Sequence, residues 1–348
     1  MFDDELSVVR NPQIRELWTG RVFITPANTA VAGRPLVNLS FAVNYAFGKL
    51  NVRGYHLANL VFHLACGVLL FGLVRRTLEI PALRAALGNR SADLAFAVAL
   101  LWTVHPLNSE VVDYVTERTE SMMALCYLLT LYASQRALGS SSPARWCAIA
   151  VLACAAGMGC KESMVTAPLM VLIYDRVFIF ESIRQAWRTR WRFYGSLAAT
   201  WLLLAALVVS QGQAASGGFA TAHVSPWSYL LNQTVMVTHY LRLAVWPQAL
   251  VLYYGWAHPV TPEAVWPYTL FIVLLLSATL VVFLRHPRIG FLGVWVFLTL
   301  APTSSLLPIP TEVGAERRMY LPLMGLVTLA VIGAVRAWRG VRHLATVG

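Results

Sequence analysis

The sequence predicts an all-α polytopic membrane protein, and three observations support that fold class. The 348-residue chain is 58% hydrophobic and only 12% charged, a balance that excludes an ordinary soluble domain. Its apolar residues gather in runs that suit membrane helices. The polar patches between these runs are of two kinds, which alternate along the chain: one kind is rich in arginine, and the other also carries acids, lysine and histidine.

The arginine-rich patches are expected in the cytoplasm, because basic residues beside membrane spans orient them. The other patches must then face the opposite compartment, so the residues with catalytic potential are expected on one extracytoplasmic side. The expected cytoplasmic residues are Arg75, Arg76, Arg84, Arg90, Arg136, Arg145, Arg184, Arg188, Arg190, Arg192, Arg285, Arg288, Arg336, Arg339 and Arg342.

The net charge of +11 has the same explanation, since most of the surplus arginine lies in short connections beside apolar runs. No basic stripe with interleaved aromatic residues supports nucleic-acid binding. The five cysteines lie in or at the ends of apolar runs, without the spacing of a metal site. We interpret them as small apolar residues and predict neither zinc nor disulfides.

Apolar runs predict nine membrane-spanning helices. Two of them are short for a hydrocarbon core of about 30 Å, so the polar residues that follow them, His105 and the Lys161–Glu162 pair, are expected below the outer surface. Recessed charges are costly unless they line a wet cavity or pair with one another. The alternative is that Lys161 and Glu162 merely cap a helical hairpin. The nine ranges are 54–75, 91–104, 119–138, 145–160, 162–180, 193–210, 266–284, 289–305 and 319–337.

Two further apolar segments are not expected to cross. Segment 226–246 contains Arg242, and a crossing there would put the arginines that follow residue 284 on the wrong side, so it is assigned as an interfacial or re-entrant helix. Segment 33–48 is apolar on one face but carries Arg34, and it should lie along the outer surface. The chain thus divides into an extracytoplasmic first loop, 1–53, and a multi-span domain, 54–348.

Several short motifs occur in the order seen in one known family. With these motifs, and over essentially its whole length, the chain resembles the membrane domain of the transmembrane-and-tetratricopeptide-repeat proteins, which are relatives of the protein O-mannosyltransferases with the GT-C fold. That family carries a transmembrane helix before its Asp-Asp pair and helical repeats after the membrane domain; this sequence shows neither, so a first span is apparently missing and no tetratricopeptide domain is expected. The motifs are Phe2-Asp3-Asp4, Gly33-Arg34-Pro35-Leu36, Gly54-Tyr55-His56, His105-Pro106 with Glu110, Lys161-Glu162-Ser163, Tyr240-Leu241-Arg242-Leu243 with Trp246-Pro247, and Ala315-Glu316-Arg317-Arg318-Met319-Tyr320-Leu321-Pro322.

The resemblance implies transfer of a sugar, mannose in the family, from a polyprenyl-phosphate donor to a protein Ser or Thr hydroxyl on the extracytoplasmic face. Attack by a hydroxyl needs a general base, and Asp3 or Asp4 suits that role. The phosphate leaving group needs cations to hold its developing charge. One carboxylate without a covalent nucleophile implies inversion at the sugar. The candidate cations are Arg317 and Arg318, followed by Arg118 and Lys161.

Further polar residues in these motifs are expected to line or support the site. They are Arg34, His56, His105, Glu110, Glu162, Arg242, Glu316 and Tyr320. His56, Asn59 and His63 form a polar stripe on the first span that favours hydrogen bonds between helices over metal ligation. Whether acids such as Glu110 and Glu316 gather on a divalent cation stays open, and Arg317 and Arg318 have a rival role as interfacial anchors.

Three other functions compete with the transferase. A lipid-linked glycan ligase of the same fold would show the same sidedness, and an inactive relative or membrane scaffold would keep the same motifs. A solute transporter should carry ionisable residues near the bilayer midplane, and Asp175, toward the inner end of its helix, is the one acid within a predicted span that comes near this description. The compact chain favours a bacterial plasma membrane, with the endoplasmic reticulum as the eukaryotic alternative.

Overall fold

The computed structural model describes residues 2–87, 89–210, 225–255, 260–304 and 312–347, and in these ranges the chain is helical and contains no strand. The all-α prediction is therefore confirmed. The α-helices are α1 (Phe2–Asp4), α2 (Pro35–Gly48), α3 (Val52–Leu78), α4 (Pro81–Leu87), α5 (Ser91–Thr103), α6 (Ser109–Asp113), α7 (Arg118–Ala137), α8 (Pro143–Met158), α9 (Ala167–Phe178), α10 (Ile183–Ser210), α11 (Pro226–Val245), α12 (Pro262–Arg285), α13 (Pro287–Leu300) and α14 (Pro322–Val347). Shorter turns of helix are η1 (Glu5–Val9), η2 (Pro12–Arg15), η3 (Gly20–Phe23), η4 (Pro106–Asn108), η5 (Val115–Glu117), η6 (Glu162–Thr166) and η7 (Glu316–Met319).

Every predicted span contains a helix, and prolines explain where several of them begin. Proline lacks a backbone N–H and has a helical φ, so it is favoured in the first turn of a helix. The predicted span 319–337 accordingly starts as a separate turn, η7, and its α-helix begins at Pro322. Likewise 162–180 opens with η6, and α9 carries Pro168 in its first turn. The last residue of 289–305 lies outside the described residues.

Helix length separates these elements into two groups. Among the described residues, α3, α10 and α12 are long and apolar enough to cross a bilayer, and a fourth span results if α5 and the following segment Pro106–Asp113, bent by 56°, count as one. The structure is thus consistent with a helical membrane protein, and the figure of nine spans stays a prediction. α12 has no buried residue in its apolar window, which suits a lipid-facing surface.

The span predicted at 193–210 begins just after a kink in α10. The span expected at 193–210 belongs to a helix that begins ten residues earlier, at Ile183, and has non-helical backbone angles at Arg190. Arg190 is buried and pairs with Asp175 of α9 at 2.5 Å, while the Tyr194 hydroxyl donates to the same carboxylate oxygen. A buried ion pair therefore ties α10 to α9, and the acid that a transporter would use is held by two partners.

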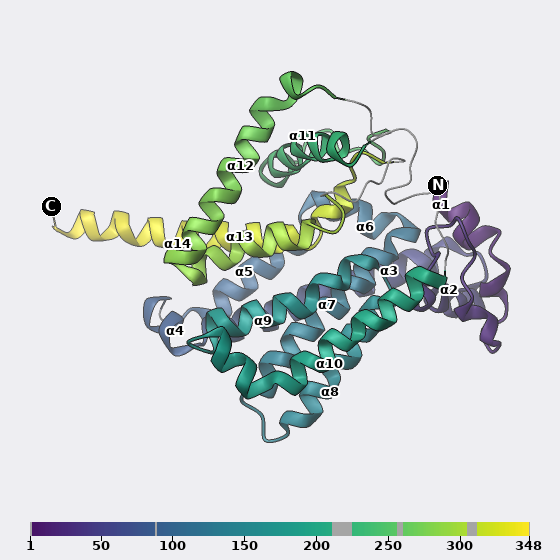
Figure 1. The fold of residues 1–348 in the computed structure, drawn as a ribbon, viewed down its shortest axis with the longest axis horizontal. Helices are drawn as coiled ribbons and strands as arrows, with labels where there is room; N and C mark the ends of the chain where they lie inside the picture. The colour runs from purple at the N-terminus through teal and green to yellow at the C-terminus, as the bar shows by residue number, and fades with distance from the viewer. Residues whose placement is uncertain (1, 88, 211–224, 256–259, 305–311, 348) are drawn as a thin grey trace.

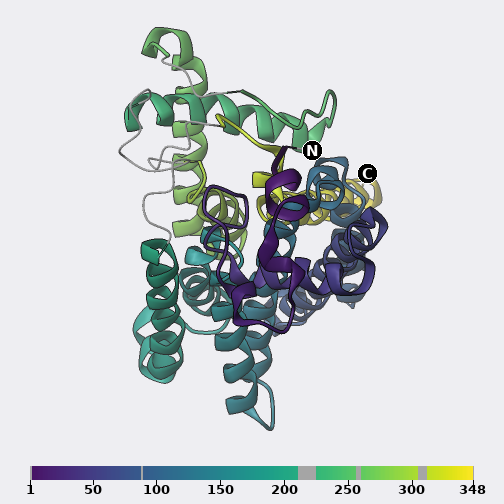
Figure 2. The same ribbon diagram turned by 90° about the vertical axis from the view of Figure 1, so that its right-hand side faces the viewer.

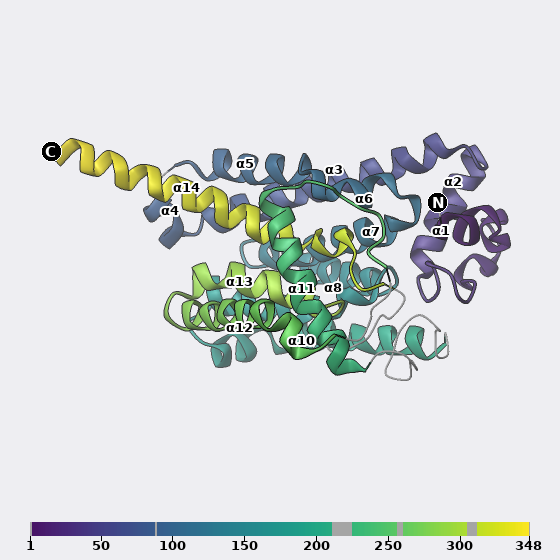
Figure 3. The same ribbon diagram turned by 90° about the horizontal axis from the view of Figure 1, so that it is seen from above.

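The helices pack as a bundle whose two ends differ. α3, α5 and α7 pack together, α8 lies against α7 and α10, and α13 connects α12 to α14 and α9. The N-terminal segment and α2 lie at one end of the long axis, and α4 and the far end of α14 lie toward the other (Figures 1 and 3). Seen from the first end, the N-terminal segment lies nearest the viewer (Figure 2).

Hydrogen bonds to a buried asparagine hold the N-terminal segment on α2. The side chain of Asn11 donates to the Asn38 amide oxygen at 2.8 Å, and the Asn38 amide nitrogen donates to the carbonyl of Val22. Asn38 is fully buried, so these bonds have no competition from water. Asn38, a polar residue of segment 33–48, is thus used inside the protein.

Candidate active site

The N-terminal acid pair rests on the turn between α6 and α7. The backbone N–H of Asp3 donates to the hydroxyl of Tyr114 at 2.9 Å, and the backbone N–H of Thr116 donates to Oδ1 of Asp4 at 3.1 Å. Burial raises the pKa of Asp4 above its usual 3.8, although the hydrogen bonds from Thr116 oppose that rise. Asp3 remains exposed. The pair is therefore positioned by η5, the turn that ends in Glu117.

Glu117 is buried among cations. Its Oε2 lies 3.2 Å from Nε of Arg317 and 3.9 Å from Nζ of Lys161. Burial alone would raise the pKa of Glu117, but attraction from Arg317, Lys161, Arg34 and Arg318 outweighs it and lowers the pKa below the usual 4.5. Glu117 therefore stays ionised and links the Asp-Asp segment to the basic residues.

Arg317 is the centre of this cluster and has three acidic neighbours. Its guanidinium donates to Glu110 at 2.6 Å and to Glu312, in addition to its contact with Glu117. Its backbone N–H also donates to Glu110, at 2.8 Å. A guanidinium with this many fixed partners has one orientation, which is what a specific anion-binding group requires.

The recessed charges pair across the bundle, as the short spans predict. Lys161 follows α8 and pairs at 2.5 Å with Glu120 in the first turn of α7. Glu162 pairs instead with Arg34, at the start of α2, at 2.9 Å. Lys161 and Glu162 are therefore not merely partners in one hairpin turn, since each joins a different pair of helices.

The other two candidate cations are more enclosed. Arg318 donates to the Gln233 side chain, the Tyr229 hydroxyl and the carbonyls of Glu312 and Val313. Its side chain is 4% exposed, compared with 16% for Arg317. These bonds fix the 312–318 segment against α11.

Arg118 is completely buried and has only neutral hydrogen-bond partners among the described residues. Its guanidinium donates to Asn59 at 2.7 Å, to Asn44 at 2.6 Å and to the carbonyl of Tyr55 at 2.9 Å, and it lies over the ring of Phe41. It therefore joins α2, α3 and α7 at one point.

Asn59 and His63 confirm the expectation of hydrogen bonds between helices. Besides accepting from Arg118, Asn59 donates to the carbonyl of Tyr114. His63 Nε2 lies 2.9 Å from the Thr103 carbonyl, which can only accept, so Nδ1 accepts from the hydroxyl of Tyr320 at 2.7 Å. Tyr320, a predicted support residue, is thereby locked between α3 and α5.

The remaining predicted residues lie at the edge of the cluster or outside it. His105 Nε2 donates to the Ala244 carbonyl at the end of α11, since its Nδ1 accepts from the N–H of Leu107. Glu316 accepts from the Val251 N–H and the Tyr254 hydroxyl. His56 and Arg242 are exposed on α3 and α11 and belong to none of the ion pairs found among the described residues.

Sequence reasoning missed several residues of the cluster. Glu120 had a local signal, because it lies three residues after Glu117 and so shares a helical face with it. Glu312 had a weaker one, five residues before Arg317 in a polar stretch. Tyr114 and Thr116 gave none, because one acts through its hydroxyl and the other through its backbone N–H.

The donor set also bears on the open question of a divalent cation. In the described part of the chain, no three His, Cys, Asp or Glu side chains are grouped so that they could hold a metal ion. The acids Glu110, Glu117 and Glu312 surround a guanidinium instead.

Several known proteins are similar in sequence to this chain. Neither a protein-family model nor a solved structure matches the chain. The protein O-mannosyl-transferase Tmtc2 of Drosophila melanogaster is 27% identical over 69% of this chain and 25% of its own length. Human protein O-mannosyl-transferase TMTC3 is 30% identical over 51% of this chain and 19% of its own length. Human protein O-mannosyl-transferase TMTC4 is 28% identical over 51% of this chain and 27% of its own length.

The matches thus span about a quarter or less of each of these relatives. The relatives carry the name that the motifs predicted, which confirms the family resemblance. The chain is a homologue of the protein O-mannosyl-transferases of the TMTC family.

Proposed function

We propose that this chain transfers mannose from a polyprenyl-phosphate donor to a Ser or Thr hydroxyl of a protein, with inversion at the sugar, on the extracytoplasmic side of a membrane. The names of its homologues support a glycosyltransferase. The observation that carries the proposal is the meeting of Asp3 and Asp4 with the Glu117–Arg317–Lys161 cluster through one short turn. A GT-C type of fold belongs to the same proposal.

In this proposal Asp3 is the general base. It is exposed, so an acceptor hydroxyl can reach it, whereas Oδ1 of Asp4 is engaged by the Thr116 N–H. As the hydroxyl oxygen attacks the anomeric carbon, its proton passes to Asp3 and the bond to the phosphate oxygen breaks. Asp4 is then a positioning residue that fixes the segment on η5.

Arg317 and Lys161 are the cations proposed to hold the leaving phosphate. The electron pair of the broken bond leaves with polyprenyl phosphate, whose oxygens need nearby positive charge. Among the four candidates these two are the most accessible, with side chains 16% and 10% exposed. Glu312, at 15%, is more exposed than Glu110 at 2%, so Glu312 is the carboxylate that gives way to phosphate on Arg317.

The test is transfer of labelled mannose from polyprenyl-phosphate mannose in membranes that contain the full-length protein. Asp3→Asn should lose transfer by about a hundredfold or more at unchanged abundance, because general-base catalysis contributes about 10²–10⁴. Asp113→Asn is the matched control, since Asp113 is an exposed acid at the end of α6. Normal transfer by Asp3→Asn would remove the proposed base, and transfer from another lipid-linked sugar alone would replace mannose.

The proposed compartment follows from the alternation of arginine-rich and acid-bearing patches. The expectation of a bacterial plasma membrane rests on the compactness of the chain alone. The relatives compared above are animal proteins, which favours the eukaryotic alternative.

A further inference from the structure

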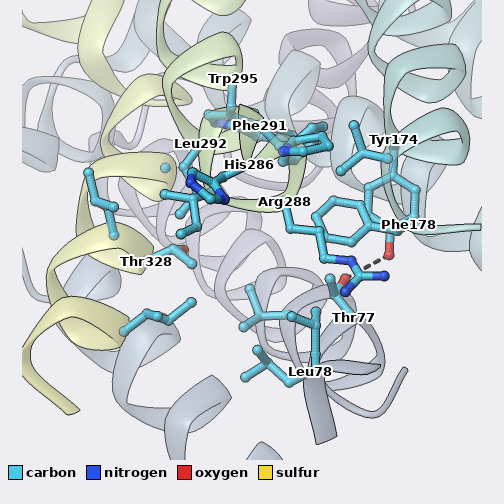
Figure 4. A pocket seen from close by; sticks show the side chains of 18 of the residues that line it. Thr77, Leu78, Tyr174, Phe178, His286, Arg288, Phe291, Leu292, Trp295 and Thr328 are labelled. Carbon is cyan, nitrogen blue, oxygen red and sulfur yellow. Dashed lines mark hydrogen bonds between the residues drawn. The ribbon is translucent and has the colours of Figure 1, made fainter. Parts of the chain in front are cut away.

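A cavity lies at the opposite ends of the helices that carry the candidate site. It has a volume of about 640 Å³ and is bounded by α3, α4, α9, α13 and α14. Its walls are largely apolar, and Figure 4 shows Phe178, Phe291 and Trp295 around it. Part of the lining comes from the last third of α3 and the end of α9. Asn59 of the site lies near the start of α3, and Glu162 lies in η6, which precedes α9.

The polar side chains deep in this cavity already have partners. The hydroxyls of Thr77 and Tyr174 lie 2.7 Å apart (Figure 4), and the amide of Gln135 donates to Tyr174 at 2.6 Å. The Thr77 hydroxyl also lies 2.8 Å from the carbonyl of Leu73. The hydrogen-bonding capacity of these groups is therefore already used within the protein, and the inner part of the cavity suits an apolar ligand.

The rim is different, because it is strongly basic. Arg176, Arg285, Arg288 and Arg336 all line the cavity, and Glu181 is the one acid among its lining residues. None of these arginines forms an ion pair with a carboxylate in the described ranges, unlike Arg317 in the candidate site. Three of them, Arg285, Arg288 and Arg336, are exposed. The rim thus offers uncompensated guanidinium groups above an apolar interior.

We propose that this cavity binds one anionic phospholipid, with an acyl chain inside it and the headgroup phosphate on the arginine rim. Guanidinium groups match phosphate oxygens in geometry and charge, and basic pockets between membrane helices suit acidic lipid headgroups. Three of the rim arginines, Arg285, Arg288 and Arg336, belong to the arginine-rich set, so the lipid comes from the leaflet on that side. The bound chain lies between α3 and α9 on one side and α13 and α14 on the other.

The charge requirement is tested by native mass spectrometry of the full-length protein in detergent, with phosphatidylglycerol or phosphatidylcholine of identical acyl chains added. The protein should retain one phosphatidylglycerol in preference to phosphatidylcholine. The double variant Arg285→Gln with Arg288→Gln should weaken retention about tenfold or more, since each basic residue near a membrane surface contributes about 1 kcal/mol. Arg145→Gln, an exposed arginine of the same set away from the cavity, is the control.

A second pair of variants tests the cavity itself. Ala82→Trp places an indole at a lining position of α4, whereas Ala85→Trp lies one turn further on the same helix and does not line the cavity. Only Ala82→Trp should reduce retention of phosphatidylglycerol. Equal retention of both lipids, unchanged retention in the arginine double variant, or preference for polyprenyl phosphate over phosphatidylglycerol would overturn the assignment.

Discussion

Arg317 holds Glu110 at two points, although 207 residues separate them in the sequence. The backbone N–H of Arg317 donates to one carboxylate oxygen and its guanidinium donates to the other. Helix α6 is thereby attached to η7, the turn before α14. Because Arg317 also contacts Glu117, the same residue reaches the turn to which Asp3 and Asp4 are hydrogen-bonded.

Replacement of Arg317 by lysine should lower mannose transfer more than stability. A lysine keeps the charge, but its single ammonium group cannot bind Glu110, Glu117 and a phosphate in the fixed geometry of a planar guanidinium. We expect transfer to fall about a hundredfold, the usual cost of one lost transition-state donor, with a small change in thermal midpoint. Arg53→Lys, at an exposed position near the start of α3, should transfer normally. An unchanged rate in Arg317→Lys would exclude phosphate binding by Arg317.

Replacement of Arg118 by lysine should act mainly on stability. The guanidinium of Arg118 serves Asn59, Asn44 and the Tyr55 carbonyl, and an ammonium group cannot reach all three. We expect the free energy of unfolding to fall by about 3 kcal/mol, as for other buried charges that lose partners. Thermal denaturation in detergent measures the loss, with Arg21→Lys as the exposed control. A thermal midpoint equal to that of the control would show that the hydrogen bonds of the Arg118 guanidinium do not stabilise the fold.

Replacement of Gly290 by alanine should disturb the corner between α12 and α13. A Cβ at this position would lie 2.3 Å from Cα of Phe283, so the two helices would have to separate. Overpacking of this kind costs about 1–3 kcal/mol. Gly195→Ala is the matched control, because no atom lies within 4 Å of the added Cβ and alanine favours helix. Equal midpoints for the two variants would contradict the close approach.

The stability of the protein should depend on pH through Glu117. Its pKa is lower in the folded protein than the usual 4.5, because attraction from the cations that begin with Arg317 outweighs burial. The ionised carboxylate therefore stabilises the fold above about pH 4.5, and this contribution is lost as the pH falls below 4.5 through the folded pKa. The difference in thermal midpoint between wild type and Glu117→Gln should shrink over that range. A constant difference would show that Glu117 is not preferentially ionised by folding.

Reporter fusions test the orientation of the two ends. Fusions after residues 85 and 140 should report the cytoplasm, and fusions after residues 112 and 312 the opposite compartment. The ion pairs of Arg317 already require residues 110 and 312 to share one end of the molecule. A reversed pattern would move the acid cluster to the cytoplasm and remove the proposed extracytoplasmic transfer. A mixed pattern would overturn the alternation of patches itself.

The sequence alone determined the class of the protein, the position of its helices and the grouping of its polar ends. Apolar runs specify helices because a backbone in an apolar surrounding must satisfy its own hydrogen bonds, and a helix does so locally. Alternating patches then place helix ends on two sides, which is why Glu110, Lys161 and Arg317 could be assigned to one end before any contact was known.

Only the tertiary structure decided which side chains meet. Lys161 pairs with Glu120 rather than with its neighbour Glu162, and Arg118 is enclosed by uncharged groups rather than presented to a ligand. Such choices depend on how helices distant in sequence pack against one another, because a charge that loses water takes whichever partner the packing brings within reach. The local sequence does not show which distant helices pack together, and so the cluster around Arg317 could be identified only from the fold.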